Sequence, residues 1–123
     1  MQKDNYKLEF TKRLTTFSLS MIKFCETIRS DRSLWSIADQ LIRSATSIGA
    51  NVVEAKSSSS KREYINYFQI ALKSANETKY WLYLIAESSE KFKTQSDIHL
   101  KEADEISKIL AAGIITMKGK REI

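Results

Sequence analysis

The chain has 123 residues, of which 42% are hydrophobic, and a formal net charge of +5. It contains no proline, three glycines and a single cysteine, Cys25. So few turn-forming residues argue against β-sandwiches and barrels, and a lone cysteine excludes an internal disulfide framework. We therefore expect one all-α domain spanning residues 1–123, with a small core. No stretch resembles a signal peptide or a membrane span, so we expect a cytoplasmic protein without a membrane partner.

The first two predicted helices each carry one apolar stripe. They cover about residues 4–30 and 33–56, and Ser33 is the expected N-cap of the second. Apolar residues recur at spacings of three and four, which is typical of a helix that buries one face. The members are Phe10, Leu14, Phe17, Met21, Phe24 and Ile28 in the first helix, and Leu34, Ile37, Leu41, Ala45, Ile48, Val52 and Ala55 in the second.

Two further helices are predicted after a serine-rich turn at residues 57–60. The third covers about residues 61–89, and Ser60 with Glu63 forms a capping box at its start. Its two apolar stripes indicate a wide buried arc. The fourth covers about residues 96–118, with Ser96 as a candidate N-cap. Short connections leave no room for a crossover, so we predict an antiparallel up-down four-helix bundle.

The second helix contains an unusual run of small and polar residues, RSATSIGANVVEA. Gly49 costs a helix interior about 1 kcal/mol relative to alanine, so we expect another backbone to approach it closely, inside the bundle or at a subunit contact or ligand groove. Antiparallel pairing around the turn places Arg43 opposite Ser74 or Glu77. We predict that Arg43 pairs with Glu77 or Glu54, where a buried ion pair would fix the helix register. The predicted polar network comprises Arg43, Ser47, Asn51, Glu54 and Glu77.

A resemblance to a known family rests on two segments, QLIRSATSIGANVVEA and KREYINYFQIALKSANETKYWLYLI. They resemble the bacterial four-helix bundle family known as S23 or 23S rRNA intervening-sequence proteins. Ala55 and Lys73 stand where the family pattern carries glycine. The matching positions are Arg43, Ala45, Ser47, Ile48, Ala50, Asn51, Glu54, Glu63, Phe68, Ile70, Ala71, Ser74 and Glu77.

The resemblance also has implications for assembly and partners. The family is similar to the accessory variability determinant proteins of diversity-generating retroelements, which are basic five-fold bundles that associate with a reverse transcriptase and nucleic acid. For this chain the resemblance implies a pentameric ring, RNA or DNA as a ligand, and a protein partner such as a reverse transcriptase. Independently, the aromatic third helix predicts a homo-oligomer, because it carries more apolar surface than one bundle is expected to cover.

Residues for enzyme chemistry are sparse. His99 is the only histidine and is expected to be solvated or to face a partner, while Cys25 lies beside an apolar stripe and is expected to pack. Neither residue has a companion at metal-ligand spacing, and the glycines fit no phosphate-binding loop. We therefore expect a protein that is not an enzyme and has no metal site and no cofactor.

Basic residues gather at one end of the predicted bundle, where the chain termini meet the turn between the second and third helices. Serines in that turn are expected to donate hydrogen bonds to phosphate. No stacking platform is evident at this end, so the sequence predicts non-specific, salt-dependent binding of RNA or DNA. The alternative is a protein-interaction scaffold or accessory subunit with no nucleic-acid contact of its own. The predicted binding residues are Lys56, Lys61, Arg62, Lys118, Lys120 and Arg121.

Overall fold

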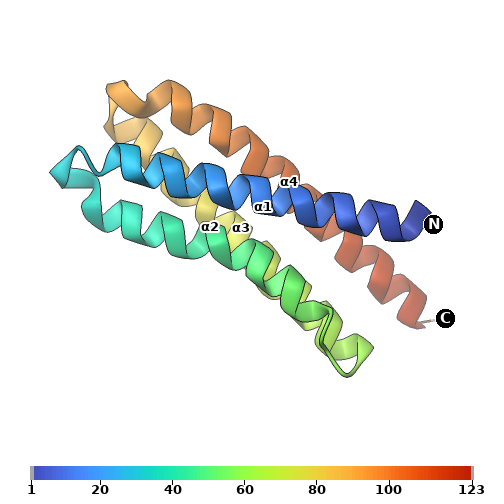
Figure 1. Cartoon of the computed structure of the whole chain (residues 1–123). Coiled ribbons are helices and arrows are strands. Elements are labelled where there is room, and N and C mark those ends of the chain that lie inside the picture. The colour runs from blue at the N-terminus through green and yellow to red at the C-terminus, as the bar shows by residue number, and fades with distance from the viewer. Residues whose placement is uncertain (1, 123) are drawn as a thin grey trace.

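The computed structural model describes the backbone of residues 2–122 and the side chains of residues 5–119. Those residues form four long helices and no strand, and each helix runs antiparallel to the next (Figure 1). The predicted up-down four-helix bundle is therefore confirmed. The elements are α1 (Gln2–Ile28), a 3-10 turn η1 (Arg32–Leu34), α2 (Trp35–Ala55), α3 (Lys61–Ser88), a second 3-10 turn η2 (Glu90–Phe92) and α4 (Lys93–Glu122).

The order of packing follows the order of the chain. Helix α2 packs against α1 and α3, and α3 packs in turn against α4. Helix α1 meets α4 through the Arg13 side chain, whose Nε donates to Glu102 Oε2 at 2.8 Å and whose Nη2 donates to Glu105 Oε2 at 2.7 Å. The beginning of α1, the α2–α3 turn and the end of α4 all lie at the same end of the bundle (Figure 1).

The predicted apolar stripes supply the core. Both apolar stripes of α3 contribute to the core. Thr78 and Ile85 belong to one stripe and Leu82 to the other, and all three side chains are fully buried. This wide arc is covered within a single chain because α3 lies between α2 and α4. It therefore gives less support to a homo-oligomer than the sequence suggests. The largest fully buried apolar side chains are Leu14, Met21, Ile28, Leu41, Ile48, Leu82, Ile85, Ile106 and Leu110.

Two of the three predicted helix caps differ in the structure. Ser60 is the N-cap of α3 as predicted, and its Oγ accepts from Glu63 N at 3.0 Å. Asp31, rather than Ser33, caps the segment before α2, because its carboxylate accepts from the backbone and hydroxyl of Ser33. Ser96 lies inside α4, fully buried and without a hydrogen-bond partner among the described residues. The helix begins earlier than predicted because the buried Phe92 ends the preceding turn.

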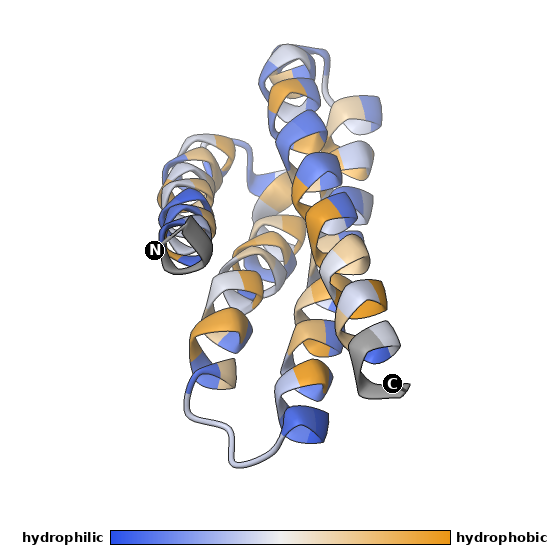
Figure 2. Ribbon diagram, turned by 90° about the vertical axis from the view of Figure 1, so that its right-hand side faces the viewer, coloured by the Kyte–Doolittle hydropathy of each residue, from blue (hydrophilic) through white to orange (hydrophobic). Residues whose placement is uncertain are grey.

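Hydrophobic and hydrophilic residues are interspersed along every helix rather than separated into long apolar runs (Figure 2). None of the helices in the described part of the chain is long and apolar enough to cross a bilayer. The apolar residues are spaced instead for packing one helix against another.

Candidate nucleic-acid interface

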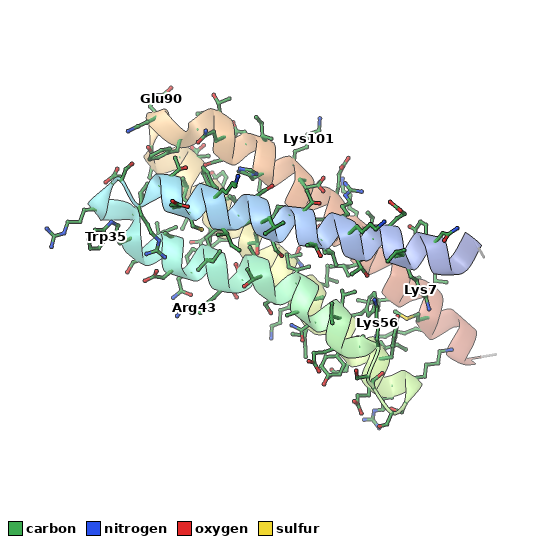
Figure 3. All side chains as sticks on the ribbon, in the orientation of Figure 1. Lys7, Trp35, Arg43, Lys56, Glu90 and Lys101 are labelled. Carbon is green, nitrogen blue, oxygen red and sulfur yellow. The ribbon has the colours of Figure 1, made fainter. Side chains whose placement is uncertain are left out.

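Five exposed cations lie around the end of the bundle that contains the α2–α3 turn, and Figure 3 labels two of them, Lys7 and Lys56. Within the described residues, none of the five is part of an ion pair. Of the predicted binding residues, Lys120 and Arg121 have side chains outside the described part of the chain. We call the described set the basic end; it comprises Lys7, Lys56, Lys61, Arg62 and Lys118.

A groove of about 1030 Å³ opens at this end, between the first turns of α1 and α3 and the last turns of α4. We call it the end groove. Three lysines and no carboxylate are among the residues that line it. The lining residues are Tyr6, Lys7, Phe10, Ser58, Ser59, Ser60, Lys61, Tyr64, Phe68, Lys108, Ile109, Ala112, Gly113, Thr116 and Met117.

The end groove contains a stack of aromatic rings. The ring centroids of Tyr64 and Phe68 are 5.0 Å apart, and their planes are inclined by only 23°. Lys7 Nζ lies 6.0 Å from the centroid of the Tyr64 ring. This aromatic pair lies at the end where the sequence predicts no stacking platform. Tyr64 and Phe68 are one helical turn apart, which places them on the same face of α3.

Two serines of the α2–α3 turn donate hydrogen bonds within the chain. Ser58 Oγ donates to Ala55 O at 2.6 Å, and Ser59 Oγ donates to Glu63 Oε2 at 3.1 Å. The hydroxyl hydrogens of Ser58 and Ser59 are therefore used in closing the turn. Ser60 Oγ only accepts, from Glu63 N, so donation from the turn to phosphate stays a prediction for Ser60.

The small and polar residues of α2 form a hydrogen-bonded seam with α3. Asn51 Nδ2 donates to Ser47 O at 2.8 Å and to Ser47 Oγ at 2.9 Å. Ser74 Oγ donates to Ser47 Oγ at 3.0 Å, and Thr78 Oγ1 donates to Ser44 Oγ at 2.9 Å. Short side chains let the two helices lie close together while satisfying their hydroxyl groups. This seam explains why serine, threonine and asparagine occur in the middle of α2.

The predicted charged members of the network lie elsewhere. Arg43, Glu54 and Glu77 are all exposed, and the side chain of Arg43 projects away from the bundle (Figure 3). Arg43 has no ion-pair partner within the described residues, whereas Glu77 Oε2 accepts from Trp81 Nε1 at 3.1 Å. The predicted Arg43 ion pair is wrong. Ser44 faces Thr78, and its neighbour Arg43 is turned by about 100° from that contact.

Comparison with known proteins identifies the family. A family model described as 23S rRNA-intervening sequence protein matches residues 6–112. The chain belongs to that family. It is also similar to the crystal structure of a protein with unknown function from the S23 ribosomal protein family of Bacteroides thetaiotaomicron. That similarity has a TM-score of 0.80 and 31% sequence identity, and it covers 85% of this chain and 97% of the other. No curated protein matches the chain.

The 23S rRNA-intervening sequence protein match bears on the site residues in two ways. Lys56, Lys61 and Arg62 fall within the matched residues 6–112, whereas Lys118 lies beyond them. The match also includes most of α1 and of α4, which the sequence resemblance covers only by length and spacing. The descriptions of the family and of the similar structure name no enzyme activity.

The histidine and the cysteine of the chain lie apart from the end groove. His99 is half-buried, with its ring centroid 4.9 Å from that of Phe24. Of the two expectations for His99, full solvation is therefore wrong, and contact with a partner stays a prediction. Cys25 is buried, its Sγ lies 3.6 Å from Ala38 O, and burial raises the pKa of its thiol to about 11. A search of the described residues finds no cluster of histidine, cysteine and carboxylate groups that could hold a metal ion.

The burial of His99 makes the stability of the fold depend on pH. Burial holds the pKa of the imidazole below its ordinary value of 6.5. The unfolded chain therefore binds a proton more readily, and the free energy of unfolding should fall as the pH decreases from about 7 to 5. Urea unfolding across this range should show the fall, and His99→Gln should flatten it. An unchanged pH dependence in the variant would contradict this cause.

The carboxylates serve as an internal reference for that experiment. Hydrogen bonds from Arg13 hold the pKa of the Glu102 carboxyl below its ordinary value of 4.5. Its contribution to stability is therefore lost as the pH falls through and below that value, mostly below the range of about pH 7 to 5 in which His99 acts. His99→Gln should therefore not change how the free energy of unfolding falls at pH values below about 4.5.

Gly49 has more room than the sequence suggests. A Cβ atom at this position would lie 3.6 Å from Leu14 Cβ and 3.7 Å from Ser18 Oγ, which is ordinary contact. We therefore expect Gly49→Ala to raise the free energy of unfolding by up to about 1 kcal/mol through helix propensity. Gly113→Ala, in open space on α4, is the matched control in urea unfolding. Loss of stability in Gly49→Ala alone would show that a second backbone approaches Gly49 after all.

Proposed function

We propose that this chain is a non-catalytic protein that binds nucleic acid, RNA above all, through the basic end. The observation that carries the proposal is the set of five exposed cations around a groove that no carboxylate lines. Such cations neutralise phosphates and release condensed counterions, which supplies most of the affinity in sequence-independent binding. The first turn of α3 adds the positive end of a helix dipole at Lys61.

RNA is favoured over DNA by the family. Its description refers to an intervening sequence of 23S rRNA. The geometry itself supports a polyanion in general, because the cations interact with the phosphate charge and do not distinguish ribose from deoxyribose. We expect weak sequence discrimination, since exposed cations would contact phosphates rather than base edges.

Homo-oligomerisation is the second part of the proposal. Leu19, Ile22 and Val53 are 57%, 47% and 51% exposed on α1 and α2, and Tyr80 and Tyr83 are 56% and 52% exposed on α3. Large apolar side chains left in water favour contact with another protein surface. A pentameric ring, as the resemblance implies, would present five basic ends and increase affinity through avidity. Light scattering that shows only a monomer at tens of micromolar would contradict this part.

The same exposed apolar residues support a second candidate function. A protein scaffold or accessory subunit, with a partner such as a reverse transcriptase, would cover Leu19 and Val53 beside the smaller groove of about 390 Å³ between α1 and α2. In that case the basic end would be a solvated surface, and the chain alone would show no affinity for RNA. The two functions are therefore distinguished by RNA binding of the purified protein.

Fluorescence anisotropy of a labelled RNA at several salt concentrations tests the proposal. The logarithm of the association constant should fall linearly with the logarithm of salt concentration. With roughly three phosphate contacts in each protomer, the slope per protomer for a single strand should be about −2. Absence of binding even at low salt would overturn the proposal and favour the scaffold. A flat salt dependence would show that the cations do not contact phosphate.

A further inference from the structure

The end groove differs from the other groove of the bundle in both size and charge. It has a volume of about 1030 Å³, at the upper limit of ordinary small-molecule sites. Lys7, Lys61 and Lys108 line it without any carboxylate. The groove between α1 and α2 is smaller, and it is lined by Glu54 and by no cation. Of these two grooves, the end groove is the one that combines space with the charge that a phosphodiester requires.

Its cations are placed beside aromatic rings. Lys7 Nζ lies over the ring of Tyr64, which stacks in turn on Phe68. Tyr6, on the opposing α1 wall, is 69% exposed. Lys108 forms an ion pair with Asp104, in which Nζ lies 3.0 Å from Oδ2. Lys7 and Lys61 are therefore the lining cations without an ion pair in the described part of the chain. Aromatic faces interleaved with cations are the features by which proteins bind single-stranded nucleic acid.

Single strands and duplexes differ in what they can offer to this arrangement of rings and cations. Every base has a π face that can stack on an aromatic ring, but in a duplex that face is covered by the neighbouring base pairs. A duplex can offer its phosphates to Lys61 and Arg62, yet its bases reach a groove only after they are flipped out of the stack, at a cost in free energy. A single strand can use the cations and the rings together.

We propose that the end groove holds an unpaired base of single-stranded RNA, stacked on the face of Tyr64 that Phe68 leaves open. Lys7 would then move from the Tyr64 ring to one flanking phosphate, and Lys61 would bind the other. This inference rests on the proposed function and specifies its ligand. Stacking of one base typically changes affinity by about tenfold. The protein should therefore bind single-stranded RNA about tenfold more tightly than duplex RNA of the same length and at the same salt concentration.

Tyr64→Leu provides the direct test, because leucine keeps an apolar side chain at this half-buried position and removes the ring. Anisotropy titrations with single-stranded oligouridylate and with a duplex should show a loss of about tenfold for the single strand and almost none for the duplex. Tyr64→Phe, which can still stack, should retain the wild-type preference. Trp35→Leu is the matched control, because Trp35 is an exposed aromatic residue at the start of α2 and does not line the groove.

A second variant covers the case in which Tyr64→Leu does not fold. Gly113 lines the groove, and a Cβ atom placed on it would meet nothing within 4 Å. Gly113→Leu therefore narrows the groove without removing a ring or a charge. It should lose affinity for oligouridylate while keeping affinity for the duplex.

The outcomes separate this inference from the function on which it rests. The stacking site would be overturned if single-stranded and duplex RNA bound with equal affinity and neither Tyr64→Leu nor Gly113→Leu changed that affinity. The basic end would then bind phosphate groups alone. A preference for the duplex would overturn the stacking site as well. Failure of the wild-type protein to bind either form would overturn the proposed function itself.

Discussion

Leu82→Ala is expected to lower the free energy of unfolding by about 2–5 kcal/mol. Leu82 is fully buried on α3, within the core that α3 shares with both of its neighbours. Removal of its isobutyl group would sacrifice buried apolar area and leave a cavity that the surrounding helices fill only in part. A small domain has only about 5–15 kcal/mol of total stability, so this one change should shift urea unfolding strongly.

Ile115→Ala is the matched control for that experiment. Ile115 is also a large aliphatic residue in a helix, but it is 72% exposed. Its replacement should change the free energy of unfolding by no more than about 0.5 kcal/mol. Similar effects of the two replacements would contradict the assignment of the core. Leu82 is also about 30 Å along α3 from Lys61, so the folded variant should keep its affinity for RNA.

The largest effect on binding is expected from charge reversal at the basic end. A variant with Lys56→Glu, Lys61→Glu and Arg62→Glu loses three phosphate contacts and gains three repulsive charges. Its affinity for RNA at about 100 mM salt should fall on the order of a hundredfold. All three residues are exposed, and acidic residues in the first turn of α3 suit the helix dipole, so the fold should be retained.

A second triple variant separates the position of the charge from its total. Lys23→Glu, Lys91→Glu and Lys101→Glu change the net charge equally, but these exposed residues lie outside the basic end. This control should retain most of the wild-type affinity for RNA. An equal loss in both variants would show that net charge alone governs binding. No loss in the first variant would show that RNA binds elsewhere.

The sequence predicts the fold well because helical spacing and short turns are local signals. The expected third helix, residues 61–89, is almost the observed α3, Lys61–Ser88, and its Ser60 cap is correct. The start of α4 is less well predicted. A serine before an apolar run suggests an N-cap at Ser96, but only the three-dimensional structure shows that Phe92 is buried and already ends the turn.

The candidate site is predicted only in part. The position of the cations follows from topology, because an up-down bundle brings both termini to the α2–α3 turn. The orientation of Arg43 does not follow, since a small change in helix register moves a side chain from the seam to the solvent. Phe68 falls within an apolar stripe, so the sequence predicts that it is a core residue. Its stacking on Tyr64 becomes visible only when the end groove between α1, α3 and α4 is known.

Photo-crosslinking tests the location of RNA binding most directly. Single-stranded RNA carrying a photoreactive uridine analogue would be irradiated with the wild-type protein, and the crosslinked peptides would be identified by mass spectrometry. We expect crosslinks in the peptides that contain Tyr6, Lys61 and Tyr64, because these residues line the end groove. We also expect the crosslinks to weaken as salt is raised. Crosslinks confined to the opposite end, around Arg32 and Lys91, would contradict binding through the basic end.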